Sequence, residues 1–179
     1  PSLIQGEITP AYAFLPISTI REIYKSVDNL KLIYLIRNPI DRAWSSALMA
    51  LQRAEMTFEE ASDQWFIDHF RSKGSLARGD YEGTIKSWSR IFGQEALLII
   101  HYDHIVDRPV NVLQSCFRHL DVNILTDQQL QGLRYSDRFF KGPGYAIRPS
   151  LYPVLRELYV SRIESLESAL GLNLISWKD

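Results

Sequence analysis

Two uninterrupted apolar runs dominate the hydrophobic pattern of the chain. The first covers residues 32–36, and the second covers residues 96–102, staying apolar as far as His101. Neither run alternates with polar positions, and both are rich in branched side chains. A run of this kind is typical of a strand buried on both faces of a parallel sheet.

The segments between and around these runs carry apolar residues at helical spacing. Pro39 in a first turn and Gly171 as a C-cap mark the two clearest helix boundaries. In contrast, residues 72–79 predict a largely polar break and residues 135–150 an irregular loop. The predicted helices cover residues 18–25, 39–53, 57–66, 80–92, 109–120, 126–132 and 149–170.

Buried strands separated by helices predict an α/β fold: a three-layer α/β/α arrangement with a parallel sheet. Two strands are few for such a sheet, because the average sheet holds about 5–6. We therefore expect a short strand near Leu3 and Ile4 and another part of the sheet before Pro1. No repeat or linker divides the chain, so residues 1–179 are predicted to form a single domain, incomplete at its N-terminus.

Composition narrows the classes of function. The net charge of -1 provides no general basic field for nucleic acid, so an anion site must be local. Cys116 is the only cysteine, which excludes an intrachain disulfide and a cysteine-based metal cluster. No apolar run reaches transmembrane length. We expect a cytoplasmic, bacterial-like protein, with the Golgi lumen as the alternative for part of a longer membrane-anchored chain.

The most informative chemistry follows the first strand. Arg37 comes at its carboxyl end, where ligands bind in open α/β sheets, and the next helix carries Ser45. An arginine, free helix N–H groups and a hydroxyl together suit a phosphate. Alternatively, Arg37 only ends the strand and pairs with Asp41 or Asp103. Arg42, between the two binding positions, is predicted to be structural.

These residues also carry a family resemblance. Residues 35–45 read Leu-Ile-Arg-Asn-Pro-Ile-Asp-Arg-Ala-Trp-Ser and resemble the 3′-phosphate-binding segment of sulfotransferases that use 3′-phosphoadenosine 5′-phosphosulfate (PAPS). Residues 6–12, Gly-Glu-Ile-Thr-Pro-Ala-Tyr, are similar to a segment of the heparan-sulfate-type and bacterial branch. Residues 79–92 resemble that branch's helix before the next strand. The resemblance implies a P-loop-NTPase-like sulfotransferase fold.

The resemblance also implies the nucleotide contacts. Arg37 and Ser45 would hold the 3′-phosphate of PAPS and of its product, PAP. Lys141 and the Gly142 amide resemble the loop that closes over the nucleotide, and Arg148 is a further candidate for the same anion. No metal is expected. The sulfuryl acceptor would be a hydroxyl or amine of a small molecule or a glycan, with a small hydroxylated molecule preferred.

The departures from the family pattern concern the reacting end of PAPS. The family's Lys-x-Gly-Thr-Thr-type loop, which binds the 5′-phosphosulfate, has no match, and Ile8 replaces a family lysine. We expect that loop and its strand to precede Pro1 or to belong to another chain, and this polypeptide alone to be inactive or severely impaired. Glu7 is a candidate base, although the base remains unassigned; Thr9 and Tyr12 would shape the acceptor pocket or only form a turn.

Two other classes of function remain open. A nucleotide kinase-like enzyme would need an aspartate at a strand end for Mg²⁺, and Asp103 after the second strand is the near candidate. A non-catalytic nucleotide-binding or scaffold domain is the other alternative. His101 and His104 could form a base or metal pair, but no familiar zinc-ligand spacing accompanies them.

Overall fold

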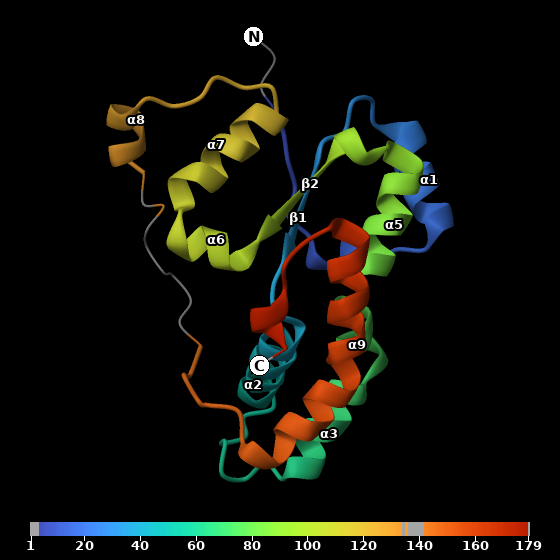
Figure 1. The fold of residues 1–179 in the computed structure, drawn as a ribbon, viewed down its shortest axis with the longest axis vertical. Coiled ribbons are helices and arrows are strands. Elements are labelled where there is room, and N and C mark those ends of the chain that lie inside the picture. Colours follow the sequence, from blue (N-terminus) through green and yellow to red (C-terminus); the bar gives the residue numbers. More distant parts are fainter. Residues whose placement is uncertain (1–3, 134, 136–141, 179) are drawn as a thin grey trace.

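The computed structural model describes residues 4–133, 135 and 142–178, and Figure 1 shows its fold. In the described part, the sheet consists of β1 (Leu32–Ile36) and β2 (Leu97–His101). The two strands run parallel, and their register pairs Leu32 with Leu97 and Ile36 with His101. The two apolar runs of the sequence are therefore neighbours in one sheet, and their carboxyl ends meet at one edge.

Helices lie on both sides of this sheet (Figure 1). One side carries α1 (Ile17–Ser26), which packs on α5 (Tyr81–Phe92), and the other carries α6 (Tyr102–Asp107) and α7 (Pro109–His119). The α/β class and the parallel sheet are confirmed. The layers form because α5 buries Tyr81, Ile85 and Trp88 at helical spacing, as the sequence pattern predicted.

A helical layer beyond the carboxyl ends of the strands holds most of the core. It comprises α2 (Pro39–Arg53), α3 (Asp63–Arg71), α4 (Lys73–Arg78) and α9 (Tyr152–Leu170). No helix in the described ranges has both the length and the apolar character that crossing a membrane requires. The short elements are α8 (Asp127–Gln131) and the 3₁₀ turns η1 (Pro10–Phe14), η2 (Gln94–Ala96), η3 (Pro149–Leu151) and η4 (Ile175–Trp177).

The sheet differs from the prediction in two respects. Ile33 and Leu35, on one face of β1, are 40% and 50% exposed, so the prediction that this strand is buried on both faces is wrong for the described chain. The helices α6 and α7 pack against β2, and α7 also reaches β1 where His119 contacts the Leu32 carbonyl. In addition, Ile4 has no regular secondary structure, so the expected short strand is absent there; Leu3 lies outside the described residues.

Two local signals were misread in the segment after α2. The predicted polar break is instead the helix α4, which begins because the Ser72 hydroxyl accepts a hydrogen bond from the Ser75 N–H. The predicted capping box of Thr57 and Glu60 does form, but it closes only a turn. The helix α3 starts later, where Ser62 provides the cap.

Candidate functional site

Arg37 occupies the carboxyl end of β1, as predicted. Its guanidinium lies over the ring of Tyr102, 5.0 Å from the ring centroid. Because Ile36 pairs with His101, the residues that follow them, Arg37 and Tyr102, lie beside each other at this edge of the sheet. Within the described residues, no carboxylate lies within 4.0 Å of the Arg37 guanidinium, so its hydrogen-bond donors are available to a ligand.

The Asn38 side chain holds the start of α2 with two hydrogen bonds, one to the helix and one to the C-terminal segment. The Asn38 side chain accepts a hydrogen bond from the Ile40 N–H at 3.0 Å, as predicted for an N-cap. Its amide nitrogen donates to the Trp177 carbonyl at 3.3 Å, and the Trp177 indole donates to Asp103 at 3.4 Å. The C-terminal turn η4 therefore ties the turn after β1 to the start of α6.

Ser45 lies on α2, and its hydroxyl makes no hydrogen bond to any described residue. It is one helical turn beyond Asp41, so the two side chains share a side of the helix. Desolvation raises the pKa of Asp41; Arg37 opposes this shift and Asp103 adds to it. The carboxylates of Asp41 and Asp103 therefore act on the same region as Arg37. Their negative charge disfavours the binding of an anion there.

Arg42 has the structural role that was predicted. Its Nη2 donates to the Ser75 carbonyl at 2.9 Å, to the Ser75 hydroxyl at 3.3 Å and to the Tyr159 hydroxyl at 3.0 Å. These contacts link α2 to α4 and α9. The guanidinium therefore points away from the Arg37 edge and into the helical layer.

Glu7, Thr9 and Tyr12 form one hydrogen-bonded cluster. The hydroxyls of Thr9 and Tyr12 each donate to Glu7 Oε1 at 2.8 Å. These two hydrogen bonds lower the pKa of Glu7, which favours its carboxylate form and makes it a weaker base. The Trp88 indole donates to the Tyr12 carbonyl at 3.2 Å and anchors the cluster to α5. No contact joins the described atoms of this cluster to Arg37.

The predicted nucleotide loop is described only in part. Lys141 lies outside the described residues, and Gly142 is exposed with open space around it. Further along, the Tyr145 carbonyl accepts a hydrogen bond from the Trp44 indole at 2.7 Å, and its ring stacks on Phe58 at 4.3 Å. Since Trp44 precedes Ser45 on α2, this loop passes along the helix that carries one of the predicted phosphate ligands.

Arg148, the further phosphate candidate, is held by protein groups. It forms an ion pair with Asp63 at 2.7 Å and donates to the Phe58 carbonyl at 2.6 Å. Its guanidinium also lies 4.5 Å from the Phe58 ring centroid and 4.9 Å from that of Phe66. Hydrogen bonds from Ser150 and Arg148 lower the pKa of Asp63. A phosphate could bind Arg148 only in competition with these partners.

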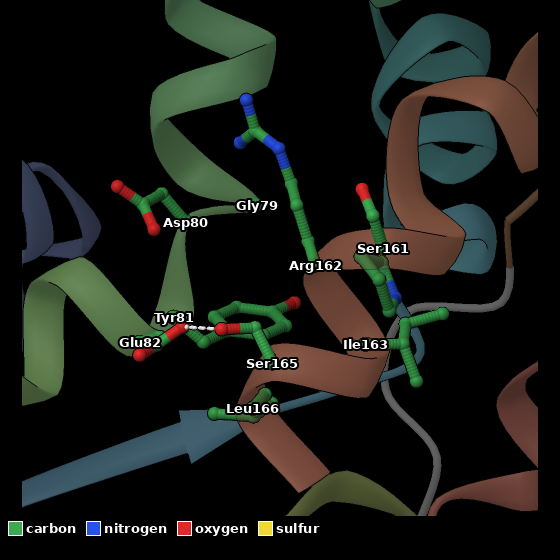
Figure 2. Close-up of a pocket in the computed structure, with 10 residues that line it drawn as sticks. Gly79, Asp80, Tyr81, Glu82, Ser161, Arg162, Ile163, Ser165 and Leu166 are labelled. Carbon is green, nitrogen blue, oxygen red and sulfur yellow. Dashed lines mark hydrogen bonds between the residues drawn. The ribbon is translucent and has the colours of Figure 1, made fainter. Parts of the chain in front are cut away.

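A cavity of about 160 Å³ lies between the start of α5 and α9 (Figure 2). Its charged side chains already have partners: Asp80 caps α5, Glu82 accepts from Ser165 and Arg162 donates to the main chain of α4. Burial raises the pKa of Tyr81 to about 12, so its phenol stays neutral. None of the predicted binding residues lines this cavity. Its lining consists of Pro39, Gly79, Asp80, Tyr81, Glu82, Ser161, Arg162, Ile163, Ser165 and Leu166.

His101 and His104 do lie together, with ring centroids 5.0 Å apart and an interplanar angle of 21°. Burial lowers the pKa of His101, and His104 adds to this effect. The described residues contain no group of three or more His, Cys, Asp or Glu side chains that could hold a metal. The pair forms a stacked aromatic contact beside Trp177, whose ring centroid is 5.5 Å from that of His101.

Two residues at this edge were missed from the sequence. Tyr102 could have been found, because in-register parallel strands place the residue after the second strand beside Arg37. Trp177 had no local signal, since it is distant in the sequence and joins the edge only through the tertiary fold.

A solved structure shares this fold. The crystal structure of a sulfotransferase from Alicyclobacillus acidocaldarius superposes with a TM-score of 0.65 at 22% sequence identity. The match covers 94% of this chain and 65% of that one. At this identity the likeness shows the fold, which is the sulfotransferase α/β fold.

Sequence comparison then shows the family. The sulfotransferase domain model matches residues 13–136, so the chain belongs to the sulfotransferase domain family. Sulfotransferase 1B1 of Canis lupus familiaris is 28% identical over 114 residues, which cover 63% of this chain. The match spans 37% of that relative, well under two thirds of its length.

Proposed function

We propose that the protein is a PAPS-dependent sulfotransferase that transfers a sulfuryl group to a hydroxyl or amine, and that Arg37 and Ser45 hold the 3′-phosphate. One observation carries the proposal. In the described chain the Arg37 guanidinium, at the end of β1, has no carboxylate partner, and the Ser45 hydroxyl, on the second turn of α2, has no hydrogen-bond partner. Charge-assisted hydrogen bonds of this kind are each worth about 1.5–3 kcal/mol.

Further features of the described chain support a nucleotide phosphate at this position. The start of α2 adds the favourable end of a helix dipole, and Asn38 fixes its orientation. Gly142 lacks a side chain and has open space around it, so its amide can approach an anion closely. Lys141 would add a second charge from the same loop. Because Arg148 is engaged by Asp63, it is the weakest member of the proposed set.

Bound PAPS supplies an activated sulfuryl group. Transfer forms a bond from the acceptor oxygen or nitrogen to sulfur, breaks the bond from sulfur to the phosphate oxygen of PAP, and releases the acceptor proton. Glu7, whose pKa is lowered by Thr9 and Tyr12, is suited to accept a hydrogen bond from a small acceptor. We assign no residue of the described chain to the base or to the 5′-phosphosulfate.

The test is the binding of PAP, measured as a rise in melting temperature without Mg²⁺. A ligand at 100 times its Kd adds about 2.7 kcal/mol of stability, or about 5–10 °C for a chain of this length. We expect Arg37→Ala to abolish the shift and Ser45→Ala to weaken it. Arg21→Ala, an exposed arginine on α1, is the matched control and should keep the full shift.

The outcomes separate the candidate functions. No shift with PAP in the wild-type protein would contradict the proposed site. A shift that requires Mg²⁺ and ATP would instead support a kinase-like enzyme. Equal loss of the shift in Arg37→Ala and Arg21→Ala would show that only the overall charge matters.

A further inference from the structure

Trp177 contacts the two chain segments that leave the strands beside Arg37. Its carbonyl accepts a hydrogen bond from the Asn38 amide at 3.3 Å, and its indole N–H donates to the Asp103 carboxylate at 3.4 Å. Trp177 is only 4% exposed and belongs to the hydrophobic core, so packing fixes its position. One buried residue therefore holds both the residue after Arg37 and the residue after Tyr102.

The turn η4, which carries Trp177, is itself fastened to α9. Glu167 Oε1 accepts a hydrogen bond from the Leu174 N–H at 2.8 Å, and Glu167 Oε2 forms an ion pair with Lys178 at 2.7 Å. Leu174 is also buried. Since Trp177 lies between these two anchored residues in the sequence, its indole is a donor in a fixed place.

Asp103 is the carboxylate that this donor restrains. It is exposed on the first turn of α6, and in the described chain the Trp177 indole is the only hydrogen-bond partner of its side chain. The strand register places the preceding residue, Tyr102, beside Arg37. Both Arg37 and Asp103 act on the charge of Asp41, so the two opposite charges share one region. No ion pair joins these two described residues, although their charges attract each other.

We propose that Trp177 is a positioning residue, whose indole holds the Asp103 carboxylate away from Arg37 and so keeps the guanidinium available for an anion. Without this hydrogen bond, the exposed carboxylate is free to turn toward Arg37 and accept a charge-assisted hydrogen bond from it. A phosphate would then have to displace Asp103, as it would have to displace Asp63 at Arg148. The effect on nucleotide affinity rests on the proposed function, whereas the restraint on Asp103 does not.

The binding of PAP, measured by isothermal titration calorimetry, tests the effect on affinity. Trp177→Phe keeps an aromatic ring but removes the N–H donor, and we expect about fivefold weaker binding, the upper range for an exposed charge pair. Adding Asp103→Asn should restore the affinity, because the amide has no charge to pair with Arg37. Trp65→Phe is the matched control: its indole makes no hydrogen bond to a described residue, and the variant should bind PAP as the wild type does.

A double-mutant cycle of Arg37→Ala and Asp103→Asn tests the restraint without PAP. Measured by denaturant unfolding, the two effects on the unfolding equilibrium constant should be additive in free energy in the wild type, to within about twofold. In Trp177→Phe they should couple by about fivefold. Glu167→Ala loosens η4 from a distance and should also produce coupling, which keeps the test decisive if Trp177→Phe does not fold.

The outcomes separate the inference from the proposed function. Equal coupling with and without the restraint, or weak PAP binding that Asp103→Asn does not restore, would overturn the inference, because Trp177 would then act only through packing. Unchanged PAP affinity in Trp177→Phe would overturn it as well. Absence of PAP binding by the wild-type protein would contradict the proposed function, while coupling that appears only after the restraint is removed would still support the role of Trp177.

Discussion

Removing the guanidinium of Arg42 should destabilise the whole helical layer. In Arg42→Met the side chain keeps a similar length but loses every donor. The Ser75 carbonyl and the Tyr159 hydroxyl then lose the hydrogen bonds that join α2 to α4 and α9. Ser75 is 4% exposed and Tyr159 is 0% exposed, so water cannot readily replace the lost donor.

The magnitude follows from these contacts. A buried polar group left without a partner costs about 1–3 kcal/mol. The substitution leaves the hydroxyls of Ser75 and Tyr159 without their hydrogen-bond partner in the described chain, whereas the Ser75 carbonyl keeps a hydrogen bond from the Gly79 N–H. Part of this cost is offset, because Arg42 Nε is itself buried without a partner in the described structure. We therefore expect a loss of about 2–3 kcal/mol in the free energy of unfolding. For a chain of this length, that lowers the melting temperature by about 4–12 °C.

Denaturant unfolding of a double-mutant cycle with Tyr159→Phe provides the assay. Once Arg42 is replaced, removing the Tyr159 hydroxyl also removes one unsatisfied group. Arg42→Met/Tyr159→Phe should therefore be about 1 kcal/mol more stable than the sum of the single effects predicts. An unchanged midpoint in Arg42→Met, or strict additivity in the cycle, would refute the reasoning.

Three further predictions concern single positions. Asp41→Asn should tighten PAP binding in a titration and stabilise the fold above the ordinary aspartate pKa, because desolvation raises the pKa of Asp41 and the folded state disfavours its charge. Gly79→Ala should lower the melting temperature, since its Cβ would lie 2.7 Å from the ring of buried Tyr159; no change in melting temperature would contradict this. Hydrogen bonds from Ser150 and Arg148 lower the pKa of Asp63, so its contribution to stability is present above the ordinary aspartate pKa of about 3.9 and is lost as the pH falls. Asp63→Asn should therefore reduce the loss of stability at acidic pH, measured as the free energy of unfolding against pH.

Much of the local structure was predictable. The apolar runs became β1 and β2, and the helix after Pro39 ended at Arg53 as predicted. These elements have strong local signals: branched apolar residues for strands, and a cap with helical spacing for α2. The turn after Thr57 shows the limit, because the same capping hydrogen bonds can close a turn as well as a helix.

Site residues were predictable from the sequence only where their position in the chain, such as directly after a strand, also fixes their place in the sheet. The strand-end position of Arg37 was predictable because it directly follows a strand, and the structural role of Arg42 because it lies between the two predicted binding positions on the helix. The fate of Arg148 was not predictable, since its partner Asp63 is distant in the sequence and the two meet only when α3 packs against the start of α9. Long-range partners of this kind leave no periodic signal.

The sequence by itself therefore determined the α/β class and the strand-end position of Arg37, because both follow from local hydrophobic pattern and chain order. The tertiary structure decided which charged groups remain available. It left Arg37 over Tyr102 without a described carboxylate partner and paired Arg148 with Asp63. Availability depends on contacts between distant segments, which only packing of the whole chain establishes.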